Sequence, residues 1–266
     1  MPSRTPPKRR PLRTPPRLGT NKVADMELAY TIGLTATASG SIACSPATGS
    51  IAYPAGCMVV VYNILHDRQQ YFSTKGVQKA ISCVAFPTGR STVTGYVAAG
   101  ETGHQPAVLV WDTRTSQVCA TLKGHKYGIM SVAFSANGKH IISAGIEHDG
   151  QICIWEWKSG LQLMRQKLSD PVRALACSNN GATFATVGPR GHFTFWSFGG
   201  DPSGGSLPAE ARPADLGAEL RGGDFAAVAF SARKAAGDPA PAAAYALTAD
   251  GRLCYLQPTR KLQKWV

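Results

Sequence analysis

ISCVAF (residues 81–86) followed by VLVWDTRTSQVCATL (residues 108–122) has a second copy in IMSVAFSANGKHIISAG (residues 129–145) followed by ICIWEWKSGLQL (residues 152–163). Both copies carry the same landmarks in the same order, at a period of about forty residues. Repetition at this period is typical of toroids and solenoids, in which no single repeat buries its own apolar face. Such repeat surfaces usually bind other molecules and rarely catalyse reactions.

Two landmarks recur along the chain. A small residue, an apolar residue and then Ala-Phe occur at 82–86 and 131–134, in weaker form at 173–177, and again at 225–230. An aromatic residue ends an alternating apolar run in each copy, and these blade-closing aromatics are Tyr62, Trp111, Trp155, Trp196 and Tyr255. Because both landmarks keep their order, the similarity is not one of composition alone.

The apolar residues within each copy alternate at period two, as in 108–111 and 152–155, which is the pattern of β-strands. Asn-Gly and Asp-Gly dipeptides at 137–138, 149–150, 180–181 and 250–251 separate the strands as turns. Four short strands per copy form the blade of a β-propeller. The sequence therefore predicts an all-β propeller over residues 26–266, with blades at 39–74, 79–122, 124–168, 171–216 and 224–266.

Composition bounds the location of the protein. The chain has 266 residues, and its longest apolar run is far shorter than the roughly 20 residues of a membrane span. The N-terminus has no apolar stretch of the signal-peptide type. The seven cysteines include no Cys-x-x-Cys pair, which favours a reducing compartment and gives no sign of a disulfide or zinc site. We expect a cytoplasmic protein without a cofactor.

The first 25 residues form a basic, proline-rich arm that we expect to be disordered. Residues 1–22 contain six prolines and no acid, and their seven cations leave about +5 of the formal net charge of +12 for the rest of the chain: Arg4, Lys8, Arg9, Arg10, Arg13, Arg17 and Lys22. One interpretation is an electrostatic anchor for an acidic partner such as tubulin tails, nucleic acid or anionic lipid, and the other is a solvated tail. Thr5 and Thr14 precede prolines and are candidate phosphorylation sites, where added charge would offset the basic field.

One copy of the repeat contains Ser143, His125 and Asp149, the residue types of a nucleophilic triad. No nucleophile elbow or oxyanion-hole pattern accompanies them, so a structural role is favoured over catalysis. We expect related but incomplete sets in two other copies, with Thr94 beside Trp111 and Thr186 beside Trp196.

A metal site and a phosphate loop are also disfavoured. Glu101, His104 and His148 have no second ligand pair at fixed spacing. The glycine-rich stretch 199–205 lacks a following Lys-Ser/Thr and a helix, so it is interpreted as an inserted loop. The alanine-rich stretch 235–244 is interpreted in the same way.

Three runs of sequence carry a resemblance to a known family: GETGHQPAVLVWD (100–112), GHKYG (124–128) and FSANGKHIIS (134–143). They resemble the first propeller of the WD-repeat family that contains mitogen-activated protein kinase-binding protein 1 and WD repeat-containing protein 62. Shorter matching pieces lie at 32–36, 52–57, 251–254 and 262–266. The similarity spans about residues 28–266 and leaves the basic arm outside.

The resemblance implies a structural role for the tetrad of His125, Ser143, Asp149 and Trp155, in which Asp149 holds His125, His125 reaches Ser143, and Ser143 reaches the indole. It also implies a seven-bladed ring, closed by a strand within residues 26–38 that completes the last blade. Only five blades are recognisable here. We therefore expect either a piece of a longer protein or a chain that pairs its open sheet edges with another chain.

The resemblance further implies a non-catalytic scaffold that engages Jun N-terminal kinase signalling components and associates with the centrosome, spindle poles and microtubules. Partners are expected on the narrow face of the propeller or on the loop at 95–107. The alternative hypothesis is a WD-repeat subunit of a nucleic-acid-associated complex that uses the basic arm. A propeller enzyme is the remote third hypothesis, because no plausible catalytic set is present.

Overall fold

The structure is a computed structural model that describes residues 28–36, 38–74, 78–87, 93–181, 183–198, 209–231 and 243–265. The chain divides into two units, Met1–Tyr30 and Thr31–Val266. All the strands belong to the second unit, which is described below by itself.

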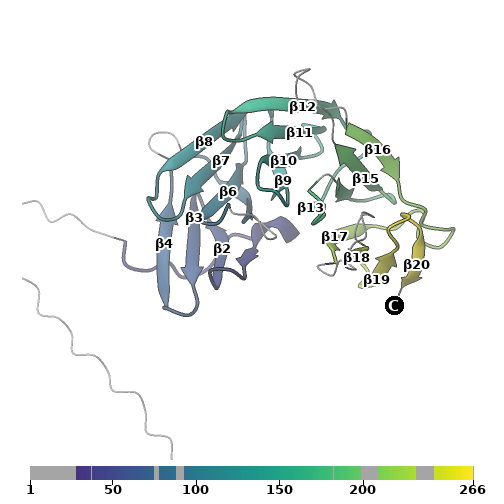
Figure 1. The fold of residues 1–266 in the computed structure, drawn as a ribbon, viewed down its shortest axis with the longest axis horizontal. Helices are drawn as coiled ribbons and strands as arrows, with labels where there is room; N and C mark the ends of the chain where they lie inside the picture. Colours follow the sequence, from purple (N-terminus) through teal and green to yellow (C-terminus); the bar gives the residue numbers. More distant parts are fainter. Residues whose placement is uncertain are drawn as a thin grey trace, which may run out of the picture. The chain divides into compact units, whose positions relative to one another are not determined.

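The described strands form five antiparallel sheets of four strands each, which confirms the prediction of an all-β fold built from propeller blades (Figure 1). We call the sheets blades one to five. Their strands are β1 (Ala43–Ser45), β2 (Ser50–Ala55), β3 (Met58–Asn63) and β4 (Arg68–Phe72) in blade one; β5 (Ile81–Ala85), β6 (Tyr96–Glu101), β7 (Ala107–Asp112) and β8 (Val118–Lys123) in blade two; β9 (Ile129–Phe134), β10 (His140–Gly145), β11 (Gln151–Glu156) and β12 (Leu161–Lys167) in blade three; β13 (Ala174–Cys177), β14 (Thr183–Val187), β15 (Phe193–Phe198) and β16 (Ala209–Pro213) in blade four; and β17 (Phe225–Phe230), β18 (Ala244–Thr248), β19 (Leu253–Leu256) and β20 (Leu262–Trp265) in blade five.

Each blade is a meander, because its strands pair in the order in which they follow along the chain. The turn glycines explain how the chain reverses so tightly. Gly138, Gly150, Gly181 and Gly251 all have positive φ, between 55° and 91°, a backbone region that glycine enters without the steric penalty of a Cβ atom. The turns predicted from the Asn-Gly and Asp-Gly dipeptides are therefore present.

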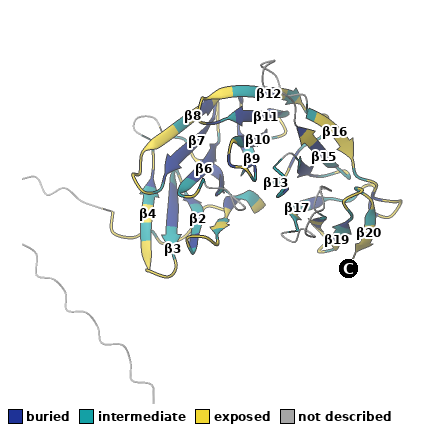
Figure 2. Cartoon of the chain, in the orientation of Figure 1, coloured by how far each residue is buried: buried dark blue, intermediate teal, exposed yellow. Residues whose placement is uncertain are grey.

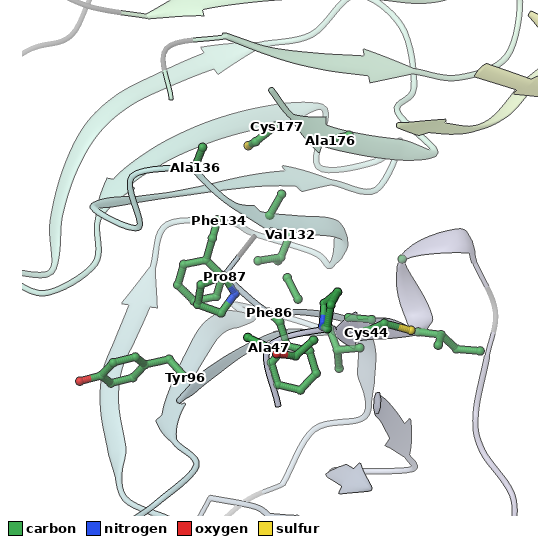
Figure 3. Close-up of a pocket in the computed structure, with 18 of the residues that line it drawn as sticks. Cys44, Ala47, Phe86, Pro87, Tyr96, Val132, Phe134, Ala136, Ala176 and Cys177 are labelled. Atoms are coloured by element: carbon green, nitrogen blue, oxygen red, sulfur yellow. The ribbon is translucent and has the colours of Figure 1, made fainter. Parts of the chain in front are cut away.

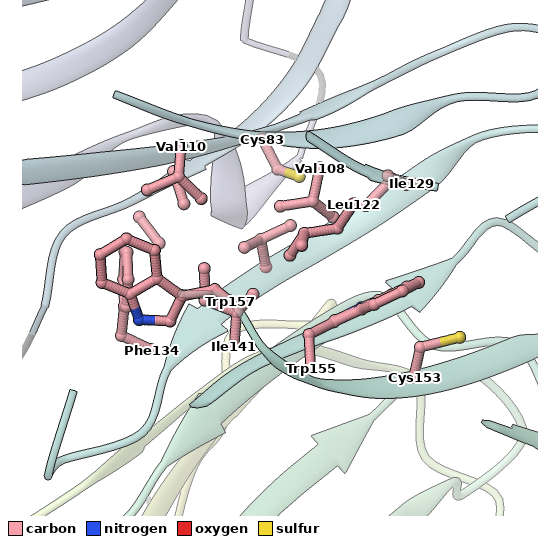
Figure 4. Close-up of a cluster of buried hydrophobic side chains, with 13 residues drawn as sticks. Cys83, Val108, Val110, Leu122, Ile129, Phe134, Ile141, Cys153, Trp155 and Trp157 are labelled. Carbon is pink, nitrogen blue, oxygen red and sulfur yellow. The ribbon is translucent and has the colours of Figure 1, made fainter. Parts of the chain in front are cut away.

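The core lies between the blades. Figure 2 colours the inner strands β6 and β7 mostly as buried, whereas the outer strands β4 and β8 are largely exposed. One apolar cluster fills each of the four spaces between consecutive blades. A single strand serves two clusters, since Val108 and Val110 face blade three while Leu109 and Trp111 face blade one. Alternation at period two along β7 thus buries both faces of the sheet, and every residue of β7 is buried, including the final Asp112. Figure 4 shows the cluster between blades two and three.

A short 3₁₀ turn, η1 (Ser39–Ser41), precedes blade one and packs against the first strands of blades two, three and four. The Ser41 hydroxyl donates a hydrogen bond to the backbone oxygen of Ser82 at 2.9 Å. Gly40 lies against Cys83 and Ser131, near the middle of β5 and β9. η1 is therefore held against the first strands.

The strand expected within residues 26–38 is not formed by the described residues 28–36. Thr31 and Thr35 instead bond to blade one. The backbone of Thr31 exchanges two hydrogen bonds with the Gln69 side chain, at 2.8 and 3.1 Å, and the backbone nitrogen of Thr35 donates to the oxygen of Pro54 at 2.8 Å. The ring-closing role of this segment stays a prediction.

The inserted loops expected at 199–205 and 235–244 fall largely outside the described residues. Pro213 ends β16, an edge strand, where a residue without a backbone N–H is tolerated. In the described part of the chain, no helix has the length and apolarity needed to cross a membrane.

Candidate functional site

Blade three holds a buried hydrogen-bonded tetrad. The Asp149 carboxylate lies 2.6 Å from His125 Nδ1, His125 Nε2 lies 2.8 Å from the Ser143 hydroxyl, and the Trp155 indole N–H donates to that hydroxyl at 2.9 Å. The four residues come from four places: the connection from β8 to β9, strand β10, the turn between β10 and β11, and strand β11. The structure thus brings together the four side chains singled out from the sequence.

Two glycines make room for the tetrad. A Cβ atom on Gly124 would lie 2.7 Å from the Trp155 ring, and one on Gly145 would lie 2.7 Å from Asp149 Cγ. Both distances are shorter than any ordinary contact, so the Gly-His dipeptide and the glycine at the end of β10 are local requirements of the tetrad. The second oxygen of Asp149 accepts hydrogen bonds from the backbone nitrogens of Lys126 and Tyr127, at 2.5 and 3.3 Å.

The electrostatics of the tetrad favour an ionised Asp149. Burial opposes ionisation, but the hydrogen bonds from His125 and from the backbone of Lys126 and Tyr127 together hold the pKa of Asp149 below its usual value. The exposed fraction of Ser143 is 0%, and its hydroxyl is engaged by an indole and an imidazole. A substrate has no route to this hydroxyl, so the arrangement fastens the β8–β9 connection to two strands.

Blade four contains a related network, in which the expected pair of Thr186 and Trp196 is joined by His192, a residue that the sequence analysis did not single out. The Trp196 indole N–H donates to Thr186 Oγ1 at 2.9 Å, and His192 Nε2 lies 3.0 Å from the same oxygen. Burial lowers the pKa of His192, and the nearby Asp170 offsets part of this effect. The imidazole comes from the β14–β15 turn, not from the connection that precedes the blade, which is why comparison with the Gly-His of blade three misses it. Its signal is Gly191-His192 directly before β15.

Blade two lacks the hydroxyl that was expected. Strand pairing sets Ser143 opposite Cys153 and Thr186 opposite Thr194, and in blade two the residue at that depth is Ala99, opposite Leu109. Thr94, suggested from the sequence, precedes β6 and lies outside the strand. The indole nitrogen of Trp111 is consequently buried without a hydrogen-bond partner among the described residues.

Tyr62 and Tyr255, the aromatics predicted to close the first and the last blade, differ from the tryptophans of the other blades in their contacts. Tyr62 lies on β3, and its hydroxyl donates to Asp67 at 3.0 Å. The prediction that Tyr255 closes blade five as Trp155 closes blade three is wrong. Cys254 and the fully buried Leu256 face blade four, so Tyr255 points to the opposite face of the sheet, where its ring packs 5.2 Å from that of Tyr245.

The blade-two loop is shorter than the expected segment 95–107, because β6 continues to Glu101 and β7 begins at Ala107. The remaining loop, Thr102–Pro106, is fastened on both sides. The backbone nitrogen of Thr102 donates to Ala80 at 2.8 Å, that of Gln105 donates to Lys126 at 2.7 Å, and the Lys79 ammonium donates to the oxygen of Gln105 at 2.5 Å. Glu101 is buried and accepts a hydrogen bond from the backbone of Ala107 at 2.9 Å.

This fastened loop forms a continuous exposed surface with its neighbours in blade three. The backbone nitrogen of Ile146 donates to Gly128 at 3.0 Å, which ties the β10–β11 turn to the β8–β9 connection. We call the exposed side chains of this surface the blade-two/three ridge: His104, Gln105, Lys126, Tyr127, Glu147 and His148. The exposed fraction of Tyr127 is 50%.

The described residues give no support to a metal site or to a reactive thiol. Glu101, His104 and His148 do not converge, and the described residues contain no group of three His, Cys, Asp or Glu side chains arranged to hold a metal ion. Burial raises the pKa of Cys83 to about 11 and of Cys153 and Cys177 to about 12, so these thiols behave as small apolar groups. Thr5, Thr14 and the cations of the arm lie outside the described residues.

Comparison with known proteins agrees with this architecture. The family described as WD domain, G-beta repeat, matches residues 116–156. WD repeat-containing protein 62 from Sus scrofa is 36% identical over 245 residues, which cover 91% of this chain and 15% of that protein. Mitogen-activated protein kinase-binding protein 1 from Homo sapiens is 35% identical over 239 residues, or 88% of this chain and 15% of that protein.

A more distant similarity covers half of the chain. Cilia- and flagella-associated protein 52 from Homo sapiens is 29% identical over 137 residues. This chain spans about 15% of the length of the two relatives that it matches over most of its own length. The blade architecture, the matched repeat and the similarity along about nine tenths of the sequence lead to one conclusion. The chain belongs to the WD-repeat family of WD repeat-containing protein 62 and mitogen-activated protein kinase-binding protein 1.

Proposed function

We propose that this chain is a non-catalytic protein-interaction scaffold. One observation carries the proposal. The Ser-His-Asp set of the chain is sealed in blade three and bonded to an indole, whereas the loops between the strands present polar and aromatic side chains to solvent. WD repeats of the relatives support the same role, since such repeats provide rigid surfaces for partners.

We assign the docking surface to the blade-two/three ridge. Hydrogen bonds from both neighbours hold Thr102–Pro106, so the ridge loses little conformational entropy when a partner binds. Tyr127 supplies an exposed aromatic ring between polar side chains, which is the composition of an interface hot spot. The ridge includes the loop that the sequence suggested for docking.

The name of one relative indicates the class of partner. Mitogen-activated protein kinase-binding protein 1 is named for binding a kinase of that class. For this chain we propose components of the Jun N-terminal kinase pathway as partners, and a cytoplasmic location at the centrosome, spindle poles or microtubules.

The test measures binding of Jun N-terminal kinase to the full chain by surface plasmon resonance. Tyr127→Ala is expected to weaken binding by about tenfold or more, the usual effect of truncating a hot-spot aromatic. Leu161→Ala is the matched control, because Leu161 is also 50% exposed but begins β12, away from the ridge. Equal affinities of the two variants for the kinase would show that the ridge is not the docking surface. If the parent chain does not bind Jun N-terminal kinase, the proposal of this kinase as a partner is wrong.

A second candidate function rests on the charge of the arm. Seven cations and no acid in residues 1–22 suit an acidic partner, including the nucleic acid of a nucleic-acid-associated complex. The supporting observation is the formal net charge of +12 for the whole chain.

A further inference from the structure

Charged side chains of the blades lie away from their first strands. Those strands line a cavity of about 1610 Å³ (Figure 3), and none of the described residues in its lining is Asp, Glu, Lys, Arg or His. Charged side chains gather instead where the connection between blades three and four, residues 168–173, meets the β14–β15 turn. This connection contains one exposed serine, Ser169.

The backbone around Ser169 is open to an enzyme. Ser169 follows β12, the outer strand of blade three, so one edge of that extended strand has no ladder partner. The backbone nitrogens of Leu168 and Arg173 are anchored to other segments by hydrogen bonds of 2.8 Å. Between these anchors, the backbone of residues 169–172 makes no hydrogen bond to any described residue. A serine without backbone bonds thus follows a strand that is already extended.

Two cations precede the serine on the same outer strand. Arg165 and Lys167 are both exposed, and they stand four and two residues before Ser169. Because they are two residues apart on a strand, their side chains point to the same face of β12. Serine kinases that prefer basic substrates recognise such charges on the N-terminal side of the acceptor hydroxyl. The sequence around Ser169 therefore suits an enzyme of this preference.

A guanidinium lies close to the serine. Ser169 Oγ donates a hydrogen bond to Asp170 Oδ2 at 2.8 Å, and Arg190 Nη2 lies 3.8 Å from Asp170 Oδ1. Arg190 Nη2 also lies 4.0 Å from Glu147 Oε1, and both ion-pair distances are too long for a hydrogen bond. The Arg190 side chain is 63% exposed, and exposed ion pairs contribute little to stability. Arg190 can therefore leave these carboxylates for a stronger acceptor.

A phosphate on Ser169 would be such an acceptor. It carries a charge of about −1.5 to −2 at pH 7, and beside the Asp170 carboxylate it would be repelled unless a cation lay between them. A guanidinium can donate two parallel hydrogen bonds to phosphate oxygens, which are stronger than its present contacts. Arg190 is the cation that the structure places beside Asp170.

We propose that Ser169 is phosphorylated by a serine kinase that recognises basic residues, and that Arg190 receives the phosphate. In this reaction Ser169 Oγ bonds to the γ-phosphorus of ATP, the bond from that phosphorus to the ADP oxygen breaks, and the hydroxyl proton passes to the catalytic carboxylate of the kinase. Arg190 then turns away from Glu147, so the modified chain presents a more acidic blade-two/three ridge. Only this effect on partners rests on the proposed scaffold role.

The first test asks whether Ser169 accepts the phosphoryl group. The full chain is incubated with Mg²⁺, ATP and the catalytic domain of protein kinase C, and mass spectrometry follows modification at each residue. Ser169 is expected to be modified, and Lys167→Ala to slow this modification by about tenfold through loss of a charged contact with the enzyme. Lys158→Ala is the matched control, because Lys158 is exposed but lies in the β11–β12 turn. An unmodified Ser169, or equal rates in the two variants, would overturn the site.

The second test asks whether Arg190 holds the phosphate. Phosphoserine is introduced at Ser169 during synthesis of the full chain, and phosphorus NMR follows its second ionisation. A neighbouring guanidinium favours the dianion, so Arg190→Gln is expected to raise the midpoint by about half a pH unit or more. Arg173→Gln should leave the midpoint unchanged, because Arg173 is bonded to Asp224 at 2.7 Å.

An unchanged midpoint in Arg190→Gln, or an equal rise in both variants, would show that Arg190 does not receive the phosphate. The melting temperature of unmodified Arg190→Gln should match that of the parent chain, because the substitution removes only weak exposed ion pairs. Neither readout involves Tyr127 or the binding of Jun N-terminal kinase. Failure of docking at the ridge and failure of the phosphorylation site are therefore distinguishable.

Discussion

The blades share one strand pattern but differ in single polar atoms, such as the hydroxyl that accepts a hydrogen bond from the blade tryptophan. The indoles of Trp155 and Trp196 donate to hydroxyls at the same depth, each at 2.9 Å, but Ala99 leaves the indole of Trp111 without an acceptor. An unpaired buried donor destabilises a fold by more than an ordinary hydrogen bond stabilises it. Blade two is therefore locally destabilised at Trp111.

Ala99→Ser is therefore expected to stabilise the chain. The new hydroxyl would stand toward Trp111 as Ser143 stands toward Trp155, and the gain should be about 1 kcal/mol in the free energy of unfolding, measured by urea denaturation. Ala98→Ser is the control, because Ala98 is equally buried on the other face of β6, where none of the described residues has a buried donor without a partner. It should destabilise the chain, and stabilisation by both variants would contradict the argument.

Removing a tetrad member should be costly. His125→Ala and Asp149→Asn each leave buried polar groups unpaired, which should lower the free energy of unfolding by about 1–3 kcal/mol. Urea denaturation of each variant measures the loss. If both variants unfold like the parent chain, the tetrad does not stabilise blade three.

The lowered pKa of Asp149 makes its contribution depend on pH. A carboxyl whose pKa is lower in the folded state stabilises the fold above its unfolded pKa, about 3.9, and loses this contribution as pH falls toward the folded pKa. Between about pH 5 and pH 2, the melting temperature of the parent chain should therefore fall more steeply than that of Asp149→Asn. Parallel curves for the two proteins would mean that another carboxyl governs the acid transition.

At the scale of strands, the sequence predicts where the blades lie better than which side chains of a strand face the neighbouring blade. Alternation and turn glycines are local signals, and they located the five blades. The face of β19 that meets blade four depends on register with β18, and an aromatic at the end of an apolar run does not fix register. Tyr255 was misplaced for this reason.

The tetrad residues could be named from the sequence because each occupies a recognisable place in one repeat, whereas two other features could not. His192 reaches Thr186 from a different loop, and Ala99 replaces a hydroxyl whose absence shows only in the pairing of β6 with β7.

The revised assignment in β19 can be tested directly. Leu256 is fully buried between blades four and five, so Leu256→Ala should lower the free energy of unfolding by about 2–5 kcal/mol. Tyr255→Ala should cost less, because the Tyr255 side chain lies on the exposed face of blade five beside Tyr245. Urea denaturation of the two variants compares them, and the reverse order of stability would restore Tyr255 as the residue that closes the blade.

For the whole molecule, the run of positive charge without acids and the apolar packing belong to different parts of the sequence. Seven of the cations precede residue 23, and the apolar clusters lie in the blades.

Binding to duplex DNA through the arm should weaken by about a thousandfold or more between 50 and 200 mM salt, as expected for about six to ten phosphate contacts. Deleting residues 1–22 should abolish this binding and leave the melting temperature unchanged. Salt-dependent binding of equal strength by the shortened chain would place the nucleic-acid surface on the blades.

The meander order of the strands has a consequence for synthesis. Each sheet is drawn from one continuous stretch of chain and packs on the sheet made just before it. A blade therefore has all its hydrogen-bonding partners when its fourth strand leaves the ribosome, and its exposed face is then the template on which the next blade condenses. Folding can proceed vectorially from β1 toward β20, so that a nascent chain hides each new apolar sheet within the time needed to translate one more repeat.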